Sequence, residues 1–428
     1  MLQLNILRQD AAHVRERLSF RGFPNPELVD VILELDEERK KWQTEYDNIQ
    51  SRINSSSKEI GKWKAQGNEK EIKNIREKVT EWKAALDPIK KKMSATETLL
   101  QEKLVMLPNL PSPTVPPGKN AEDNVVVRSG GNDNPDLPEN AVPHWDLITK
   151  YDLIDFETGA KLTGRGFPVY KGKGAKLQRA LIQYFLDFNT ESGYTEFIPP
   201  FMVNSASAYA TGQLPDKEGQ MYHVTLDDFY LIPTSEVPLT NIYRDVIVKE
   251  QDLPIKMTAY SPCFRREAGS FGKDVRGLNR LHQFEKVEIV QIVHPEKSYQ
   301  VLEEMVDHVE RLMQSLELPY RILRLCGGDM GFTSALTYDF EVYSAAQQKW
   351  LEVSSVSNFE SYQSNRLKCR FKYESGKMQL VHTLNGSSLA LPRIVASLLE
   401  NNQQDNFIKI PAVLHSYFGS DKIVFPGT

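Results

Sequence analysis

Cysteine is scarce in this sequence, and the three that occur are far apart. Cys263, Cys326 and Cys369 form no Cys-x-x-Cys pair, which argues against a disulfide framework and against a structural zinc site. No stretch approaches the roughly 18 consecutive apolar residues of a membrane span. The N-terminal residues also lack the apolar core of a signal peptide and the composition of a transit peptide. We therefore expect a soluble, cytoplasmic protein that has no membrane partner.

An excess of positive charge is also missing. The 428 residues carry a net charge of −5, whereas proteins that bind nucleic acids normally present a basic surface. Any nucleic-acid interface must therefore be local. The length favours two domains rather than one.

Heptad spacing is present in two neighbouring stretches near the N-terminus. The core-type positions of the first stretch are Ile32, Leu35, Arg39, Trp42, Tyr46, Ile49, Ile53, Ser56, Ile60 and Trp63. Those of the second are Ile72, Ile75, Val79, Trp82, Leu86, Ile89, Met93, Thr96 and Leu100. Two such helices joined at Gly67-Asn68 can bury both seams only by folding back on each other, which predicts an antiparallel coiled-coil hairpin. A helix of about 38 residues is on the order of 55 Å long. Pro88 is expected to interrupt and kink the second helix.

The composition changes after the hairpin. A proline-rich run at 107–118 opens a polar segment, so we expect a helical arm domain at 1–110, a linker at 111–145 and a second domain at 146–428. In the second domain, helical patterns at 176–189 and 298–316 alternate with strand patterns at 229–233 and 286–293. Loops rather than crossover helices connect the strands. The expected fold class is therefore α+β, with a mostly antiparallel sheet flanked by helices.

The residues best suited to ligand chemistry lie at 263–288. Glycines at 269, 272 and 277 stand among five basic residues between Arg265 and Arg280, which predicts a flexible cationic loop that suits a polyphosphate. The strand pattern that follows places Phe284, Lys286 and Glu288 on one face, because side chains alternate along a strand. Phe284 and Glu288 would lie roughly 13 Å apart, close to the span of an aminoacyl-adenylate. The alternative is a surface hairpin whose Phe packs into the core and whose Arg and Glu pair outside.

Together these segments resemble the seryl family of class II aminoacyl-tRNA synthetases. Residues 263–288 look like motif 2 of that class, 231–244 are similar to the seryl Thr-x-Glu element, and 382–393 resemble motif 3. Residues 193–200 resemble the dimer-forming motif 1 more weakly. With the hairpin, the likeness covers essentially the whole chain. It implies a homodimeric serine–tRNA ligase that activates L-serine with ATP and transfers serine to the 3′ end of tRNA(Ser), with tRNA(Sec) as a further candidate substrate.

The resemblance also implies a set of residues that bind ATP. They are Arg265, Arg266, Glu267, Phe284, Glu352, Val353, Ser354, Ser355 and Arg393. Arg265 would contact the α-phosphate and the serine carboxylate, Phe284 would stack on adenine beside Glu267, and Arg393 would hold the γ-phosphate. Glu352 and Ser355 would hold Mg²⁺, and no zinc is expected. Taken singly, Arg393 could be a helix-start salt bridge and Glu352 an exposed strand carboxylate. Pro392 stands where the class favours glycine, and proline suits the start of a helix.

A second implied set binds the substrate serine: Thr234, Ser235, Glu236, Arg265, Glu288 and Ser387. Arg265, Glu288 and Arg393 are implied as the catalytic residues. Thr234 or Ser387 alone could equally be a capping hydroxyl. The serine carboxylate is an adequate nucleophile by itself, so no side-chain base is expected in the first step, and none is assigned in the second.

Two other classes of protein remain possible on the sequence alone. One is a different ligase of the same fold, of the threonyl, prolyl or carrier-protein type. A threonyl-type site would want a Cys/His zinc set that is missing here, and the carrier-protein ligases lack the long hairpin. The other is an inactive paralogue that serves as a scaffold through its coiled coil. The presence of Arg265, Glu267, Phe284, Glu288, Glu352 and Arg393 together argues against it.

The distal hairpin supplies the local positive charge that the whole chain lacks. Between positions 58 and 92 there are eleven basic residues and six acidic ones, a local balance of +5. The basic residues are Lys58, Lys62, Lys64, Lys70, Lys73, Arg76, Lys78, Lys83, Lys90, Lys91 and Lys92. We expect this arm to bind tRNA phosphates, and the seryl resemblance implies that it grips the long variable arm of the tRNA. The simpler alternative is the solvated flank of an ordinary coiled coil.

Overall fold

The computed structural model describes residues 1–131, 137–216, 218–268 and 276–425. It divides into two compact units. The helical unit contains residues 2–19 and 23–108, and the sheet unit contains residues 1, 20–22 and 109–428. The predicted α+β class, with a helical hairpin followed by a mostly antiparallel sheet, is confirmed.

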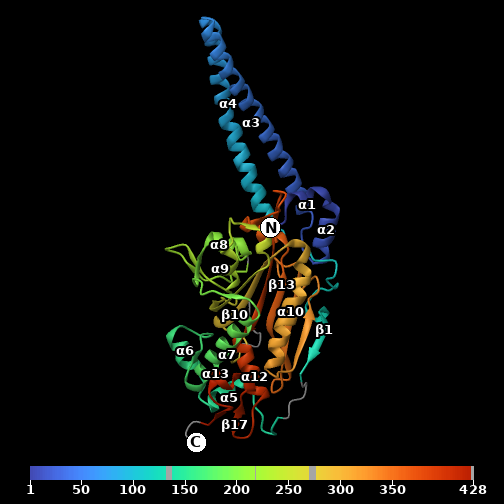
Figure 1. Ribbon diagram of the computed structural model, residues 1–428, viewed down its shortest axis with the longest axis vertical. Coiled ribbons are helices and arrows are strands. Elements are labelled where there is room, and N and C mark those ends of the chain that lie inside the picture. The colour runs from blue at the N-terminus through green and yellow to red at the C-terminus, as the bar shows by residue number, and fades with distance from the viewer. Residues whose placement is uncertain (132–136, 217, 269–275, 426–428) are drawn as a thin grey trace. The chain divides into compact units, whose positions relative to one another are not determined.

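The helical unit consists of two short helices followed by two long ones (Figure 1). They are α1 (Leu4–Gln9), α2 (Ala11–Phe20), α3 (Leu28–Ala65) and α4 (Glu69–Leu104). The turn between α3 and α4 lies where the sequence predicts it. Gly67 has a φ of +68°, a conformation that glycine adopts without strain. Asn68 caps α4, because its side chain accepts a hydrogen bond from the Glu71 amide at 3.3 Å.

The long helices form the predicted antiparallel hairpin. All nineteen heptad positions are buried or half-buried, whereas most residues between them are exposed. The ammonium of Lys92 lies 4.4 Å from the ring centroid of Trp42, and that of Lys90 lies 5.8 Å from the ring of Tyr46. The residue numbers of the contacts rise along α3 as they fall along α4, as expected of two antiparallel helices.

Two residues of the hairpin depart from the simple pattern. Arg39 interrupts the apolar seam, and its guanidinium donates to the buried Asp36 carboxylate at 3.0 Å. The expected interruption of the second helix at Pro88 is wrong, because α4 continues through it from Glu69 to Leu104. Leu86 and Ile89 are buried in the seam on either side, and this packing outweighs the low helix propensity of proline.

The sheet unit is built on an eight-stranded sheet with the order β1-β11-β12-β13-β16-β10-β9-β4 (Figure 1). Its strands are β1 (Val125–Gly130), β4 (Thr195–Glu196), β9 (Ile255–Phe264), β10 (Gln283–Val293), β11 (Tyr320–Arg324), β12 (Leu336–Ser344), β13 (Lys349–Asn358) and β16 (His382–Ala390). Within the described residues, every neighbouring pair is antiparallel except β4 with β9. β1 belongs to the segment 111–145 that we expected to be a linker, so part of that segment is an edge strand.

Smaller sheets and connecting helices surround the large sheet. The small strands are β2 (Ile154–Asp155), β3 (Val169–Tyr170), β5 (Met202–Asn204), β6 (His223–Val224), β7 (Phe229–Leu231), β8 (Ile247–Lys249), β14 (Arg370–Lys372), β15 (Met378–Leu380), β17 (Phe407–Lys409) and β18 (Lys422–Val424). The helices are α5 (His144–Lys150), α6 (Phe156–Leu162), α7 (Gly172–Glu191), α8 (Ser205–Thr211), α9 (Glu236–Asn241), α10 (Ser298–Ser315), α11 (Ser361–Leu367), α12 (Leu391–Asn401) and α13 (His415–Phe418). Short 3-10 turns cover Ala121–Asp123, Glu250–Asp252, Pro295–Lys297 and Ala412–Leu414.

The central strand β10 separates two hydrophobic cores. Val287 and Ile289 join the main core, with α7, α10 and α12. Val290 and Ile292 join a second core on the other face, with residues of α9, α11 and β14. Glu288 therefore points to the second face, as the alternation predicts. In the described residues, no helix is both long enough and apolar enough to cross a membrane.

Candidate active site

Glu288 lies in the middle of β10 and is fully buried. Its partners come from neighbouring elements: Thr234 Oγ1 donates to one carboxylate oxygen at 3.1 Å, and Asn385 Nδ2 donates to the other at 3.1 Å. The Lys286 ammonium forms an ion pair with the same carboxylate. Burial of a carboxylate is tolerated when its charge is paired and its oxygens accept hydrogen bonds. The arrangement holds Glu288 in one orientation.

Glu236, the first residue of α9, is a second buried carboxylate beside Glu288. Gln363 Nε2 donates to its Oε1 at 2.7 Å, and Asn385 Nδ2 donates to its Oε2 at 2.9 Å. The Asn385 amide thus joins both carboxylates. Thr383 donates to Gln363 Oε1 at 2.7 Å and so fixes which end of that amide faces Glu236.

The two carboxylates repel each other in a buried site. Burial, and next the charge of Glu288, raise the pKa of Glu236 to about 7. Burial also raises the pKa of Glu288, which Lys286 opposes. Near neutral pH the pair is therefore short of its full negative charge. An incoming ammonium group, which carries positive charge and several N–H donors, would restore it.

The three hydroxyl residues of the predicted serine set lie differently. Thr234 contacts Glu288, as described. Ser387 stands directly opposite Glu288 in the β10–β16 pair, so its side chain lies on the same face of the sheet. Ser235 instead donates to the Ser261 hydroxyl on β9 at 2.6 Å, and both side chains are buried. Its role in the structure is to join α9 to the sheet.

Arg265 follows the end of β9 and lies beside the start of β10. Its Cζ is 5.3 Å from the centroid of the Phe284 ring, within the range of a cation–π contact. Its amide donates to the His282 carbonyl at 3.0 Å, which continues the pairing of β9 with β10. The aromatic ring and the guanidinium therefore stand at one end of the strand that carries Glu288 further along.

The next two residues of the chain have separate roles. Arg266 is exposed, and its amide donates to the Gln220 carbonyl at 2.9 Å. Glu267 has a φ of +49° and accepts a hydrogen bond from Arg280 Nη1 at 2.8 Å. This ion pair joins the two ends of the predicted cationic loop. Residues 269–275 of that loop lie outside the described residues.

Glu352, Ser355 and Arg393 lie close together across β13 and the start of α12. The β12–β13 register shifts between Phe340 and Glu341, and such a bulge turns Glu352 and Ser355 toward the same side. Both act on the Asp339 carboxyl: Ser355 hydrogen-bonds to it, and the charge of Glu352, after burial, raises its pKa. Arg393 Nη1 donates to the Glu352 carbonyl at 2.6 Å and lies 3.9 Å from its carboxylate.

The donors around Glu352 suit a hard cation. Glu352 and Ser355 offer oxygen atoms, and Asp339 Oδ1 is buried without a hydrogen-bond partner among the residues that the structure describes. Oxygen atoms are the ligands that Mg²⁺ prefers. Across the described ranges there is no group of three or more His, Cys, Asp or Glu side chains placed to hold a metal by themselves. Phosphate oxygens would have to complete the coordination.

Val353 and Ser354 lie between these residues and have inward-facing side chains. Val353 packs into the main core, and the Ser354 hydroxyl donates to the Ser387 carbonyl at 2.6 Å. The latter bond ties β13 to the strand that carries Ser387. Pro392 is the second residue of α12, the position expected of a proline that starts a helix.

Comparison with known proteins agrees with this geometry. Residues 1–111 match the family model of the seryl-tRNA synthetase N-terminal domain, and residues 222–402 match the tRNA synthetase class II core domain (G, H, P, S and T). The serine–tRNA ligase of Salinibacter ruber is 50% identical over 425 residues, which are 99% of each chain. The chain belongs to the seryl-tRNA synthetase family.

Solved structures of seryl-tRNA synthetases have the same fold. The enzyme of Pyrococcus horikoshii complexed with ATP superposes with a TM-score of 0.88 at 34% identity, covering 99% of this chain and 100% of that one. The cytoplasmic serine–tRNA ligase of Naegleria fowleri in complex with AMP gives a TM-score of 0.88 at 26% identity, with coverages of 100% and 99%. The predicted family, fold class and enzyme class are thus confirmed.

In this member of the seryl-tRNA synthetase family, the structure adds residues that sequence reasoning missed. Asn385 connects the two buried carboxylates, Gln363 orients Glu236, and Asp339 faces Glu352. Asn385 could have been found, because it stands two residues before Ser387 on the same strand face. Gln363 and Asp339 carry no such local signal.

Proposed function

We propose that this seryl-tRNA synthetase activates L-serine with ATP at the site between Glu288 and Arg393, and then charges tRNA(Ser). The main support is the arrangement along β10. The Arg265–Phe284 contact stands at one end and the paired carboxylates of Glu236 and Glu288 stand further along. This is the order of groups in an aminoacyl-adenylate, from its purine to its ammonium.

In this proposal the serine ammonium lies against Glu236 and Glu288, and the serine hydroxyl is read beside Thr234 and Ser387. Alanine would leave buried acceptors unpaired, which lowers its use by up to about 10⁴-fold. Threonine would have to be excluded because the pocket lacks space for one more methyl group. Such exclusion lowers the use of threonine by only about 10- to 200-fold. The fixed contacts of Glu288 support such a rigid pocket.

The first chemical step is an in-line displacement at the α-phosphorus of ATP. A serine carboxylate oxygen forms the new bond to phosphorus while the bond to the pyrophosphate oxygen breaks, and pyrophosphate leaves. Arg265 would neutralise the charge that develops on the α-phosphate. Phe284 and Glu267 would hold the adenine, with Arg266 and the main chain of Val353 and Ser354 lining the nucleotide, and Arg393 would hold the γ-phosphate.

Mg²⁺ bound at Glu352 and Ser355 would supply charge neutralisation for the phosphates. In the second step, the terminal 3′-hydroxyl of the tRNA attacks the carbonyl carbon of the adenylate, and AMP leaves. Half-buried Arg265 would help to position both reacting centres without acting as a general base.

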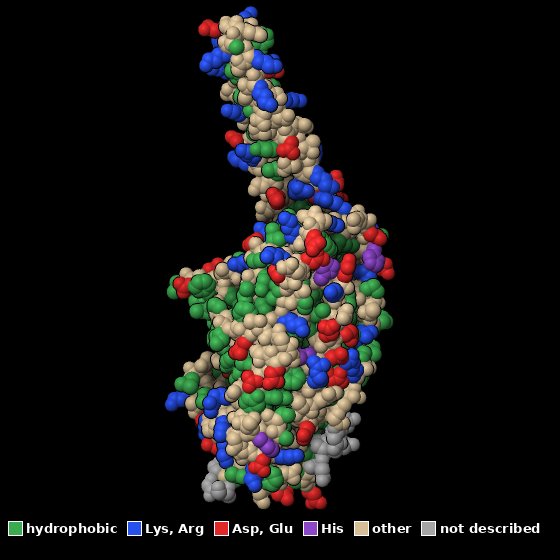
Figure 2. Space-filling model, viewed as in Figure 1, with side chains coloured by type: hydrophobic (Ala, Val, Ile, Leu, Met, Phe, Trp, Pro, Cys, Tyr) green, Lys and Arg blue, Asp and Glu red, His purple; other side chains and the backbone are tan. Residues whose placement is uncertain are grey.

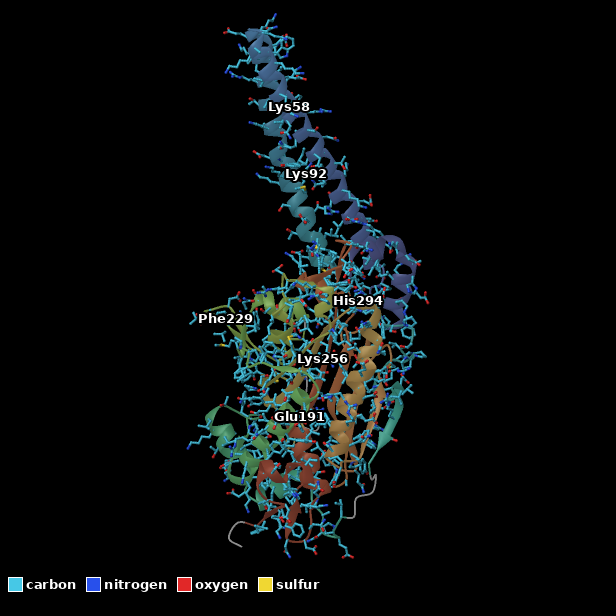
Figure 3. All side chains as sticks on the ribbon, viewed as in Figure 1. Lys58, Lys92, Glu191, Phe229, Lys256 and His294 are labelled. Atoms are coloured by element: carbon cyan, nitrogen blue, oxygen red, sulfur yellow. The ribbon has the colours of Figure 1, made fainter. Side chains whose placement is uncertain are left out.

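The arm at 1–110 is proposed to bind the tRNA, and the sheet unit is proposed to carry the chemistry. All eleven basic residues from Lys58 to Lys92 are exposed. Figure 2 shows Lys and Arg side chains along the hairpin, and Figure 3 labels two of them, Lys58 and Lys92. None of the eleven forms an ion pair with any residue that the structure describes. No carboxylate among these residues therefore neutralises their charge, which is available to phosphate groups even where Lys90 and Lys92 lie over aromatic rings. tRNA(Sec) remains a second candidate substrate.

A homodimer acting in the cytoplasm completes the proposal. The segment 193–200, which resembles the dimer-forming motif, follows α7 and forms the edge strand β4 of the large sheet. Ile198, in this segment, is 87% exposed, as expected of a side chain that a partner covers. The cytoplasm supplies both ATP and tRNA.

The deciding experiment is exchange of radioactive pyrophosphate into ATP by the purified chain. Exchange should be fastest with serine, negligible with alanine or proline, and at least about tenfold weaker with threonine at the same concentration. Arg265→Ala is the matched inactive control. Exchange that depends on another amino acid, or that is lacking for all four, would refute the proposal.

A further inference from the structure

His144 is a buried histidine, the first residue of α5, far in sequence from the residues it contacts. Its Nε2 accepts a hydrogen bond from the Leu278 amide at 2.9 Å, and its Nδ1 lies 2.7 Å from Glu400 Oε1. An amide N–H can only donate, so Nε2 must be without a proton. The proton is then on Nδ1 and is donated to Glu400. The contacts thus define one neutral tautomer.

Glu400 is held on α12 by several donors. Its Oε1 accepts hydrogen bonds from the His144 amide at 2.9 Å and from Gln347 Nε2 at 2.8 Å, and its Oε2 accepts one from Ser344. Burial alone would raise the pKa of Glu400, but the hydrogen bonds from His144 and Ser344 outweigh burial and lower it. The carboxylate is therefore a charged, fixed anchor for the imidazole. α5 and α12 lie side by side (Figure 1).

The contacts continue from Leu278 to Arg393 through a single residue. The Asn279 carbonyl accepts a hydrogen bond from Arg393 Nε at 3.3 Å. The Asn279 side chain donates to Gln347 Oε1 at 3.1 Å, and Gln347 in turn donates to Glu400. Arg393 thus rests on two carbonyls, those of Glu352 and Asn279. The position of the Asn279 carbonyl depends on the neighbouring Leu278 amide, which donates its hydrogen bond to His144.

The backbone beside His144 is shaped to accept it. Gly277 has a φ of +64°, and a Cβ added there would lie 2.2 Å from His144 Nε2, so only glycine allows this approach. One residue earlier, the Arg276 guanidinium lies 4.6 Å from the ring centroid of Trp145, the neighbour of His144. The first turn of α5 therefore contacts the segment that precedes β10 at two points, through His144 and through Trp145.

We propose that His144 is a positioning residue for ATP: as a neutral acceptor it fixes the peptide at 277–279 and thereby the direction of the Arg393 guanidinium. The inference rests on the proposed role of Arg393 at the nucleotide. It assigns no contact between His144 and substrate. Its consequence is that a change at His144 affects the use of ATP and leaves the serine pocket, which shares none of these contacts, as it was.

Two substitutions separate the two imidazole nitrogens. His144→Asn places a donor near the position of Nδ1 and can keep the bond to Glu400, but it removes the acceptor for Leu278. His144→Gln places an oxygen near the position of Nε2 and can keep the acceptor. We expect H144N to raise the KM for ATP about three- to tenfold, the effect of one hydrogen bond, with the KM for serine unchanged. H144Q should stay within about twofold of wild type, and both variants should melt at similar temperatures.

A third variant tests the other half of the connection and keeps the histidine at position 144, although Gln347 Nε2 lies 3.3 Å from His144 Nδ1. Gln347→Leu removes the partner of the Asn279 side chain and should raise the KM for ATP in the same direction as H144N. ATP binding by calorimetry, without serine, gives a second readout that does not depend on turnover. A wild-type protein that binds ATP but shows no serine-dependent exchange would refute the proposed function and leave this inference open to the calorimetric test. Equal KM values for ATP in H144N and H144Q, or equal changes in both substrates, would overturn the inference.

Discussion

The guanidinium of Arg265 lies over the ring of Phe284, with 5.3 Å between Cζ and the ring centroid. Two groups that we propose for ATP therefore support each other before any nucleotide arrives. Phe284→Leu keeps apolar volume but removes the aromatic face. It should raise the KM for ATP about tenfold in the exchange assay, because both adenine stacking and the cation–π contact are lost. Phe284→Tyr is the matched control and should change little. An unaltered KM in the leucine variant would contradict the assignment.

Replacement of Glu288 should separate the two substrates. Glu288→Ala should abolish serine activation while ATP still binds, because Arg265 and Phe284 remain. Alanine also leaves Lys286 buried without its partner, a change that destabilises, so Glu288→Gln serves as the volume-matched variant. We expect the glutamine variant to lose at least about 100-fold in serine-dependent exchange, with ATP affinity by calorimetry near wild type. Undiminished exchange in either variant would remove Glu288 from the site.

Serine binding should depend on pH through Glu236. Its pKa of about 7 is above the usual 4.5 of a glutamic acid, so at pH 6 the free protein holds a proton there that the serine ammonium must displace. Serine affinity should therefore rise between pH 6 and 8, and binding at pH 7 should release a fraction of one proton. Calorimetry in two buffers of different ionisation enthalpy measures that release. Glu288, Lys286 and Arg265 face the same carboxyl, so Glu236→Gln is the required comparison. It should release less of a proton than the wild type, because only Glu288, whose pKa burial also raises, is left to contribute. Release that is equal in both proteins would assign the proton elsewhere.

Removal of the arm should affect only the second step. Deletion of roughly residues 30–105, with the ends bridged, should leave adenylate formation nearly intact and raise the KM for tRNA steeply. Charging by the intact protein should weaken as salt rises. A finer variant changes Lys62, Lys64, Lys70 and Lys73 to Gln, with the same four changed to Arg as the control. The glutamine variant should show a smaller salt slope, by about one for each lost phosphate contact. Wild-type charging by the armless protein would make the arm a structural element.

The chain should be a homodimer in solution. Light scattering at micromolar concentration should give about twice the single-chain mass of 48.9 kDa. Ile198→Glu places a charge on an exposed apolar position of the proposed interface, and it should shift the mass toward one chain while the melting temperature of the chain stays similar. A mass of one chain for the wild type would count against the dimer.

Local periodic patterns gave the parts of the fold that were predicted well. The heptad seam and the alternation of β10 each repeat within a few residues, so the half-burial of Trp42 and the sheet face on which Glu288 lies follow from sequence alone. Contacts between distant residues carry no such signal. His144 meets Leu278 and Glu400 across 134 and 256 positions. Pro88 shows the reverse error, in which a strong local preference yields to packing on the facing helix.

The hairpin turn at Gly67 ends a seam that repeats every seven residues on both sides. Adding seven residues to each helix at matching heights would carry the turn outward by about 10 Å, while every seam residue would still face the other helix. The length of the arm can therefore change in steps of one heptad, and none of the residues around Glu288 would need to change. A protein of this design can be fitted to a longer or shorter RNA by altering length alone.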